Sequence, residues 1–323
     1  MVAGDEVLTA ENIRNRFTGK GEKQRTLVSV FADHNEKMAS LVGQEFEKST
    51  LTQYKTCLMH VQDYLKLQYN LQDVPVAKIT FEFLTGFEYY LRSIRKCANN
   101  SAIKYVKNLR KIVRICLGNG WLAIDPYINY KPKTKKTNRV VLSQEELVRL
   151  IQKEFTIERL HLVRDIFVFS CYTGLAYADA RKLKHSEVTL GIDGNRWVHT
   201  ARKKTDTISR VSVLPVALTI LEKYADHPQC VSKGLVLPVM SNQKMNAYLK
   251  EITDLCGIHK PLTFHIARHT FATTVTLSNG VPIESVSKMI GHTSIKTTQL
   301  YAQVLDHKIS EDMQMLRKKL VAS

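Results

Sequence analysis

Four polar residues in the last third of the chain have side chains suited to the chemistry of a phosphate ester: His265, Arg268, His292 and Tyr301. Arginine presents a planar fork of donors that matches two phosphate oxygens, and histidine can bind a third oxygen or carry a proton. A tyrosine hydroxyl can attack phosphorus and hold the phosphoryl group covalently. Such a set could break a phosphodiester and reseal it without water or a metal ion.

Each of the four residues also has a plainer explanation. His265 and Arg268 form an HxxR pair, which is common by chance, and they share one face only if the segment HIARH is helical. His292, in GHTS, could be a core or capping histidine, and Tyr301, in TTQLYAQV, could be a packing residue. The phosphate hypothesis therefore gains weight only from the four residues together.

The composition favours an anionic partner. The chain has 47 lysines and arginines against 30 acidic residues, a formal charge of +17, and such an excess favours polyanions or anionic membrane surfaces. It has no apolar stretch of about 18 residues or more and no signal-peptide pattern at its N-terminus. We therefore expect a soluble, cytoplasmic protein, associated with the bacterial nucleoid if its partner is DNA.

The cysteines do not indicate a metal site. They have no CxxC pair and no histidine at zinc-ligand spacing, so buried free thiols in a reducing compartment are expected, with no metal or other cofactor. The six are Cys57, Cys97, Cys116, Cys171, Cys230 and Cys256.

A basic segment divides the chain. KPKTKKTNR follows Pro126, contains Pro132 and interrupts the apolar periodicity, which predicts a linker over residues 131–140. Before the linker, apolar residues at three- and four-residue spacing predict a helical bundle over residues 26–130. Its helices are expected over residues 26–41, 49–69, 81–93 and 101–117, after a short lead-in over residues 1–25.

Basic residues gather on the helix over 101–117 and in the linker. An ordinary solvated face is the alternative for the helix taken alone. Beside a basic linker, a face that contacts phosphates is the better interpretation. The residues expected to bind DNA are Lys104, Lys107, Arg110, Lys111 and Arg114 on the helix, and Lys131, Lys133, Lys135, Lys136 and Arg139 in the linker.

The second domain is expected over residues 141–310. Ser143 and Glu146 form a capping-box pattern that begins a helix. A long apolar run, DIFVFSCYTGL, follows and reaches the TGL turn, and a new amphipathic segment starts around Tyr177. RWVHTARKKTDTISRVSVLPV alternates in the manner of two antiparallel strands joined by a short loop. The chain is thus expected to be mainly α, with one small antiparallel sheet in the second domain.

The order and spacing of the polar residues resemble the tyrosine recombinase family of site-specific, phage-type DNA integrases, from about residue 26 to the end of the chain. In that family HxxR is followed by a GH motif and, nine residues later, by a nucleophilic tyrosine, as are His265, Arg268, His292 and Tyr301 here. The resemblance implies a SAM-like core DNA-binding domain followed by a catalytic domain.

Two further motifs extend the resemblance. TGL at 173–175 is similar to the start of the family's TGLRxxE/D motif, which gives Asp179 the supporting acidic position. KKT at 203–205 is similar to the hairpin that carries the family's general-acid lysine, which favours Lys204 over Lys203.

One position departs from the family pattern. The family's first catalytic arginine follows TGL, and this chain has Ala176 there. Loss of one preorganised donor costs about 3 to 4 kcal/mol and slows cleavage roughly a hundredfold to a thousandfold, unless another group replaces it. TGLAYAD with FSCY upstream looks like integrases of Bacteroidetes mobile elements, a branch whose members can lack this arginine.

Three arginines near the motif are candidates for the replacement: Arg164, Arg181 and Arg202. We favour Arg164, because it precedes Ala176 on the helix that feeds the TGL turn and otherwise lies beside an apolar run. The alternative for Arg164 is an ion pair with Asp165 or Glu158.

The resemblance implies that Tyr301 attacks the scissile phosphate, giving a 3′-phosphotyrosyl link and a free 5′-hydroxyl. Arg268, His265, His292 and a replacement arginine would stabilise the phosphorane, and Lys204 would protonate the leaving oxygen. Strand exchange would proceed through a four-way junction held by four protomers on two DNA duplexes, with accessory DNA-bending proteins in some systems.

Both ends of the chain bear on assembly. The segment 311–323 continues a stripe of Ile309, Met313, Leu316 and Leu320 that predicts a helix, which either docks on a neighbouring subunit or folds back on its own domain. Many integrases of this branch carry an arm-binding domain ahead of the bundle. This chain begins at or just before the bundle, so we expect either a fragment or a protein that acts on simple sites.

Two other functions remain open. A type IB topoisomerase shares the Arg, Lys, His and Tyr chemistry but works as a monomer. A catalytically weak or idle DNA-binding protein on the same scaffold is suggested by Ala176. The DNA target, and the choice between integration, excision and inversion, leave no mark in the sequence.

Overall fold

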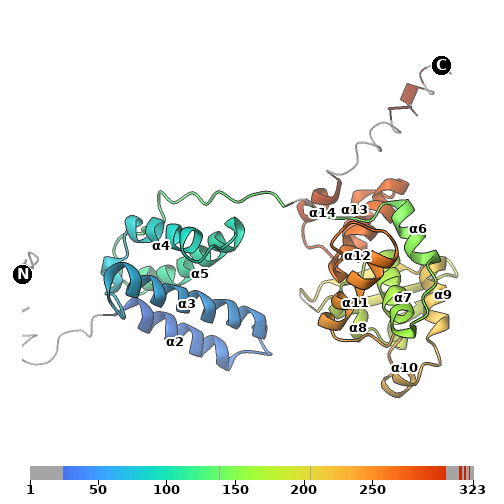
Figure 1. The fold of residues 1–323 in the computed structure, drawn as a ribbon, viewed down its shortest axis with the longest axis horizontal. Coiled ribbons are helices and arrows are strands. Elements are labelled where there is room, and N and C mark those ends of the chain that lie inside the picture. Colours follow the sequence, from blue (N-terminus) through green and yellow to red (C-terminus); the bar gives the residue numbers. More distant parts are fainter. Residues whose placement is uncertain are drawn as a thin grey trace, which may run out of the picture. The chain divides into compact units, whose positions relative to one another are not determined.

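The computed structural model describes residues 25–137, 139–203 and 205–302, together with Met313, Gln314, Leu316, Arg317 and Leu320. The chain divides into two compact units, Met1–Thr137 and Asn138–Ser323, whose boundary falls within the basic segment 131–140. Figure 1 shows the elements of each unit. Among the described residues, no helix is long and apolar enough to cross a membrane.

The first unit is a helical bundle, as its periodicity predicts. Helices α2 and α3 pack together, as do α4 and α5, and α5 also contacts α2 and α3. Phe31, Leu65, Phe87 and Leu109 are fully buried between them. The bounds are α2 Leu27–Ser40, α3 Lys48–Tyr69, a 3-10 turn Val76–Lys78, α4 Phe81–Ser93 and α5 Asn99–Gly118.

The second unit is mostly helical around a small sheet, which confirms the predicted fold class. The sheet is antiparallel in the order β1-β2-β3, and Val198 of β2 pairs with Val188 of β1 and Val211 of β3. The predicted strands are β2 (Arg196–Ala201) and β3 (Ile208–Ser212), and the short β1 (Val188–Leu190) was not predicted.

The helices of the second unit begin and end where local signals place them. Ser143 and Glu146 form the expected capping box at the start of α6, and α7 ends at Gly174, which has a left-handed φ of +69°. The bounds are α6 Gln144–Gln152, α7 Glu158–Thr173, α8 Tyr177–Lys182, α9 Pro215–Lys223, α10 Pro228–Lys233, α11 Asn242–Leu255, α12 Phe264–Thr270, α13 Ile283–Met289 and α14 Ile295–Ala302, with 3-10 turns at His185–Glu187 and Leu277–Asn279. A π-helical stretch, Phe271–Thr276, continues α12.

The C-terminal stripe can be followed only in part. Ile309 and most of the predicted helix over 311–323 lie outside the described residues. Met313, Leu316 and Leu320 are exposed, with 47%, 45% and 68% of their surface accessible. The docking role of this segment therefore stays a prediction.

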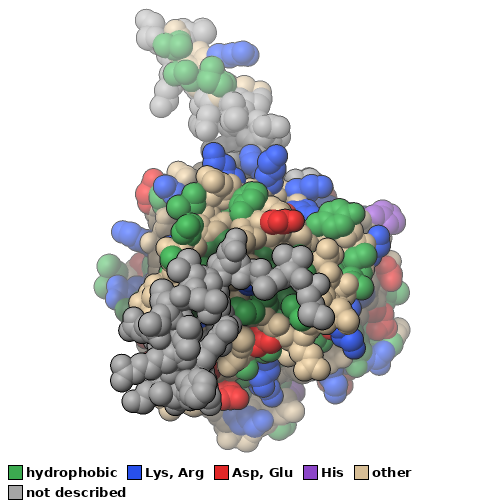
Figure 2. All heavy atoms as spheres, turned by 90° about the vertical axis from the view of Figure 1, so that its left-hand side faces the viewer, with side chains coloured by type: hydrophobic (Ala, Val, Ile, Leu, Met, Phe, Trp, Pro, Cys, Tyr) green, Lys and Arg blue, Asp and Glu red, His purple; other side chains and the backbone are tan. Residues whose placement is uncertain are grey.

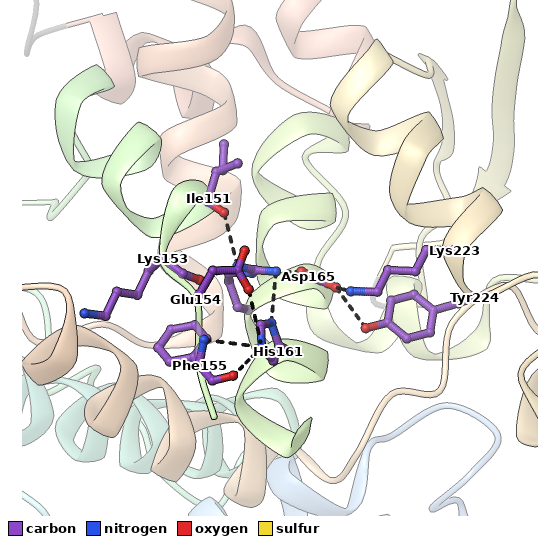
Figure 3. A network of polar contacts seen from close by, with 9 residues as sticks. Ile151, Lys153, Glu154, Phe155, His161, Asp165, Lys223 and Tyr224 are labelled. Carbon is purple, nitrogen blue, oxygen red and sulfur yellow. Dashed lines mark hydrogen bonds and ion pairs between the residues drawn. The ribbon is translucent and has the colours of Figure 1, made fainter. Parts of the chain in front are cut away.

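A buried polar network joins α7 to its neighbours (Figure 3). The Asp165 carboxylate accepts hydrogen bonds from Arg164 Nε (2.9 Å), Lys223 Nζ (2.7 Å) and the Tyr224 hydroxyl (2.9 Å). Arg164 Nη1 donates to the carbonyls of Ile151 (3.1 Å) and Lys153 (2.6 Å). Arg164 and Asp165 are only 8% and 5% exposed, so each charge is satisfied inside the protein.

Removal of the carboxylate tests this network. Asp165→Ala leaves the Arg164 guanidinium buried without its counter-ion, so we expect a loss of about 3 to 5 kcal/mol in the free energy of unfolding. Trp121 and Trp197 are the chain's two tryptophans. In a Trp121→Phe background, Trp197 fluorescence during urea unfolding therefore reports the second unit alone.

The matched control is Glu251→Ala in the same unit. Glu251 lies 3.7 Å from Arg159 and both side chains are at least 40% exposed, so its removal should cost less than about 1 kcal/mol. If Asp165→Ala costs no more than this control, the network does not stabilise the fold.

Candidate active site

Arg268 joins three segments of the second unit. It lies on α12 and is 2% exposed. Its Nη1 donates to the carbonyl of Gly174 (2.8 Å), in the TGL turn, and its Nη2 donates to the carbonyl of Ile290, beside the GH motif. Burial first, and then the charge of Arg202, lower the pKa of Arg268 to about 10, so the side chain remains a cation at neutral pH.

The TGL turn approaches α12 so closely because Gly174 has no side chain. A Cβ at this position would lie 2.5 Å from Phe271 Cδ1 and 2.9 Å from Ile290 Cγ2, which no real contact allows. Glycine also adopts the left-handed φ without strain. The turn is thereby held within reach of Arg268.

His292 and Tyr301 are positioned by the GH turn and α14. The Nδ1 atom of His292 lies 2.8 Å from the hydroxyl of Thr298, which is fully buried. Thr298 lies three residues before Tyr301, on the same face of α14. Tyr301 is 2% exposed, and a side-chain hydrogen bond links it to Arg268.

A row of rings connects the predicted residues. The His265 and His269 ring centroids are 4.5 Å apart, and those of His269 and Tyr301 are 5.3 Å apart. The His292 and Tyr301 rings are stacked, 6.1 Å apart and 10° from parallel. The structure therefore brings together His265, Arg268, His292 and Tyr301.

The hairpin between β2 and β3 contacts both α8 and the GH turn. The backbone N–H of Lys203 donates to the Asp179 carboxylate (2.8 Å), and Asp179 is buried on α8. Arg202 Nη1 donates to the Gly291 carbonyl (3.0 Å). Lys204, the expected general acid, lies outside the described residues, so its role stays a prediction.

Arg139, which is expected to bind DNA, contacts the ring of Tyr301. Its guanidinium carbon lies 5.0 Å from the centroid of the Tyr301 ring, a distance typical of a cation–π interaction. Arg139 is half-buried. The other linker residues expected to bind DNA, Lys131, Lys133, Lys135 and Lys136, are exposed.

The basic face of α5 is largely as expected. Lys104, Lys107, Lys111 and Arg114 are exposed, whereas Arg110 is half-buried and stacks 5.1 Å above the Tyr127 ring. Figure 2 shows lysine and arginine side chains spread among acidic and apolar ones on the face in view. DNA binding is therefore expected at the basic residues of α5 and of the linker, and the total charge alone does not indicate where DNA would bind.

Two histidines of the site, His269 and His292, have lowered pKa values. Burial is the main cause that lowers the pKa of His292 to about 4, followed by the charges of Arg268, Arg202 and Arg139. Burial also lowers the pKa of His269 to about 4, followed by the charge of His265. At neutral pH, His269 and His292 are therefore uncharged imidazoles that can each donate one hydrogen bond.

The choice of Arg164 as the replacement arginine is corrected by the structure. Arg164 lies ten residues before Gly174, about 15 Å along the helix axis at the usual rise. Its guanidinium donates to Asp165 and to the carbonyls of Ile151, in the last turn of α6, and Lys153, directly after α6. The ion pair with Asp165, the stated alternative, is what forms. Arg181 is exposed, and its Nη1 donates to the Tyr177 hydroxyl (3.4 Å).

Two residues of the site were not singled out from the sequence. Thr298 holds His292, and His269 fills the space between His265 and Tyr301. Both had a sequence signal, because Thr298 precedes Tyr301 by one helical turn and His269 adjoins Arg268 in HIARH. In the part of the chain that the structure describes, no cluster of three or more His, Cys, Asp or Glu residues could hold a metal ion.

The geometry and the family comparisons agree. The Phage integrase SAM-like domain matches residues 26–132, and the Phage integrase family matches residues 140–308. The chain belongs to the phage integrase family, which confirms the predicted resemblance to tyrosine recombinases. The resemblance to the Bacteroidetes branch stays a prediction.

Individual relatives span most of the chain. Tyrosine recombinase XerD of Listeria monocytogenes is 26% identical over 284 residues, which cover 84% of this chain and 93% of that protein. A lambda integrase dimer bound to a core site is similar in fold, with a TM-score of 0.69 at 16% identity, covering 86% of this chain and 95% of that one. A lambda integrase tetramer bound to a Holliday junction gives a TM-score of 0.68 at 14% identity, covering 90% and 83%.

The protonation of His269 and His292 can be measured directly. We expect both imidazoles to stay neutral in the free protein until the pH approaches about 4, whereas unfolded histidines titrate near 6.5. Because the unfolded state then binds more protons between these values, the stability of the second unit should fall as the pH drops from about 6.5 to about 4.

Histidine-selective ¹³C labelling with NMR follows the titration, and His269→Gln and His292→Gln assign the two signals. Urea-unfolded protein supplies the reference. A His292 midpoint near 6.5 in the folded protein would contradict its burial beside arginines.

Proposed function

We propose that this protein is a site-specific DNA recombinase that cleaves and rejoins DNA through a phosphotyrosyl bond to Tyr301. The observation that carries the proposal is the placement of Tyr301 beside the buried cation of Arg268 and between the rings of His269 and His292. The reaction needs a cation that stabilises the charge developing on the phosphate, and Arg268 can supply it.

In the proposed reaction, the Tyr301 oxygen attacks the scissile phosphorus and the 5′-oxygen of the next nucleotide leaves. Arg268 and the side chains of His265 and His292 donate to the non-bridging oxygens. The leaving oxygen takes its proton from Lys204. The product is a 3′-phosphotyrosyl link, which retains the energy of the phosphodiester for rejoining.

Asp179 is proposed as a positioning residue. Its buried carboxylate accepts from the Lys203 N–H, which anchors the hairpin at the residue that precedes the proposed general acid in the sequence. The charge of Asp179 also favours the cationic form of Arg268. Both effects support the site without a contact between Asp179 and the phosphate.

Double-stranded DNA is the proposed partner. The exposed lysines and arginine of α5 and the four exposed linker lysines offer contacts to phosphates. The similarity to a lambda integrase tetramer on a Holliday junction supports a tetramer on two duplexes as the assembly. Accessory DNA-bending proteins and association with the nucleoid belong to the same proposal.

One observation favours a second candidate, a DNA-binding protein with weak or no cleavage activity. Ala176 leaves the TGL turn without the arginine that the family carries there. Covalent capture of DNA separates this candidate from a recombinase, since only a recombinase forms the phosphotyrosyl bond.

Nicked half-site duplexes tiled across the DNA that flanks the gene provide the substrates. A nick near the cleavage site releases a short fragment and traps the covalent intermediate. We expect an adduct that survives detergent and disappears with protease, and that is lost completely in Tyr301→Phe.

Tyr89→Phe is the matched control, because Tyr89 is 71% exposed in the other unit; it should form the adduct at the parental rate. An adduct that persists in Tyr301→Phe would show another nucleophile. No adduct on any flanking duplex, with DNA binding intact, would favour the idle DNA-binding protein.

A further inference from the structure

The position after the TGL turn has no positive charge of its own. Ala176 is the residue at the start of α8 and is half-buried. Its methyl group offers nothing to a phosphate. A cation that serves this position must therefore come from another segment.

Arg202 follows β2 and lies directly on the GH turn. Its Nη1 donates to the Gly291 carbonyl (3.0 Å). Gly291 has a φ of +60°, and a Cβ there would lie 2.8 Å from Arg202 Cδ. The stem of Arg202 thus occupies the space that a side chain at position 291 would fill, next to His292.

Two contacts fix the backbone around Arg202 to α8, the helix that Ala176 begins. On one side, Lys182 Nζ donates to the Ala201 carbonyl, and on the other, the Lys203 N–H donates to Asp179 (2.8 Å). Arg202 therefore starts beside α8 and reaches the GH turn. A phosphate bound between the TGL turn and the GH turn would lie beside these same two segments.

The positive charge around Arg202 is only partly compensated, because the Asp179 carboxylate acts on Arg268 more weakly than Arg202 does. After burial, Arg202 is the leading cause that lowers the pKa of Arg268, and it also lowers the pKa of His292. In the described part of the chain, no carboxylate forms an ion pair with either arginine, and Arg202 Nε is buried without a hydrogen-bond partner. Two like charges held close together in this way favour an anion between them.

We propose that Arg202 supplies the second guanidinium of the phosphate clamp, in place of the arginine that Ala176 lacks. With Arg268 it binds the non-bridging oxygens of the scissile phosphate and stabilises the charge that develops on them. This inference rests on the proposed recombinase function. Arg202 is thereby a catalytic residue, and neither Arg164 nor Arg181 has this role.

The test compares single-turnover cleavage of a nicked half-site by four proteins. Arg202→Ala should cleave roughly a hundredfold to a thousandfold more slowly than the parent, because one preorganised donor is lost, with little change in DNA affinity. Arg181→Ala, the exposed control, should cleave at the parental rate. Adding Ala176→Arg to Arg202→Ala should restore much of the rate, since it returns a guanidinium to the same gap.

A second measurement does not require cleavage. Inorganic phosphate should raise the melting temperature of the second unit in the parent and in Arg181→Ala, and raise it less in Arg202→Ala, because only the last lacks a cation of the anion site. Parental cleavage by Arg202→Ala, or an undiminished response to phosphate, would overturn the role of Arg202.

The two proposals fail in different ways. If the parent forms no adduct but phosphate stabilises it through Arg202, the anion site stands and the recombinase function fails. If the parent forms the adduct and Arg202→Ala does so equally fast, the function stands and this inference fails.

Discussion

The buried guanidinium of Arg268 is the interaction on which the site depends. Its two carbonyl partners belong to the turn after α7 and to the segment before the GH motif, so one side chain joins three parts of the chain that are far apart in sequence. An unsatisfied buried charge costs several kcal/mol. A shift of the TGL turn or the GH turn would remove a hydrogen-bond partner from this buried charge. The position of the phosphate-binding groups is therefore tied to the stability of the second unit.

This constraint also decides which groups carry charge. Arg268 remains a cation after burial, whereas burial and the neighbouring arginines hold His269 and His292 neutral. The positive charge at the site is therefore nearly constant around neutral pH, and the imidazoles remain able to exchange a proton.

The sequence was sufficient for those features that depend on local spacing. The HxxR pair, the GH motif and the tyrosine nine residues later place four side chains whose proximity follows from the family pattern, and Ser143, Glu146 and Gly174 mark helix ends through their own backbone chemistry. The sequence could not decide among Arg164, Arg181 and Arg202, because separation along the chain does not show which of these side chains lies near Ala176 in the fold. Arg164 lies about 15 Å from Gly174 along the axis of α7. The β2–β3 hairpin, in contrast, places Arg202 beside α8. Strand β1 was missed because three residues carry too little alternation to be distinguished from a loop.

The segment at the end of the linker, residues 139–142, contacts the candidate active site. The Leu142 N–H donates to the Thr270 hydroxyl (3.1 Å), and the Leu142 carbonyl accepts from Thr274. Residues 139–142 are thus held against α12 and its π-helical continuation, and Arg139 reaches the Tyr301 ring from there. A guanidinium over the ring restricts the ring's rotation and adds to the positive potential at its hydroxyl. Because hydrogen bonds of the second unit anchor this segment, the fold itself places the guanidinium of Arg139 beside the ring of the proposed nucleophile.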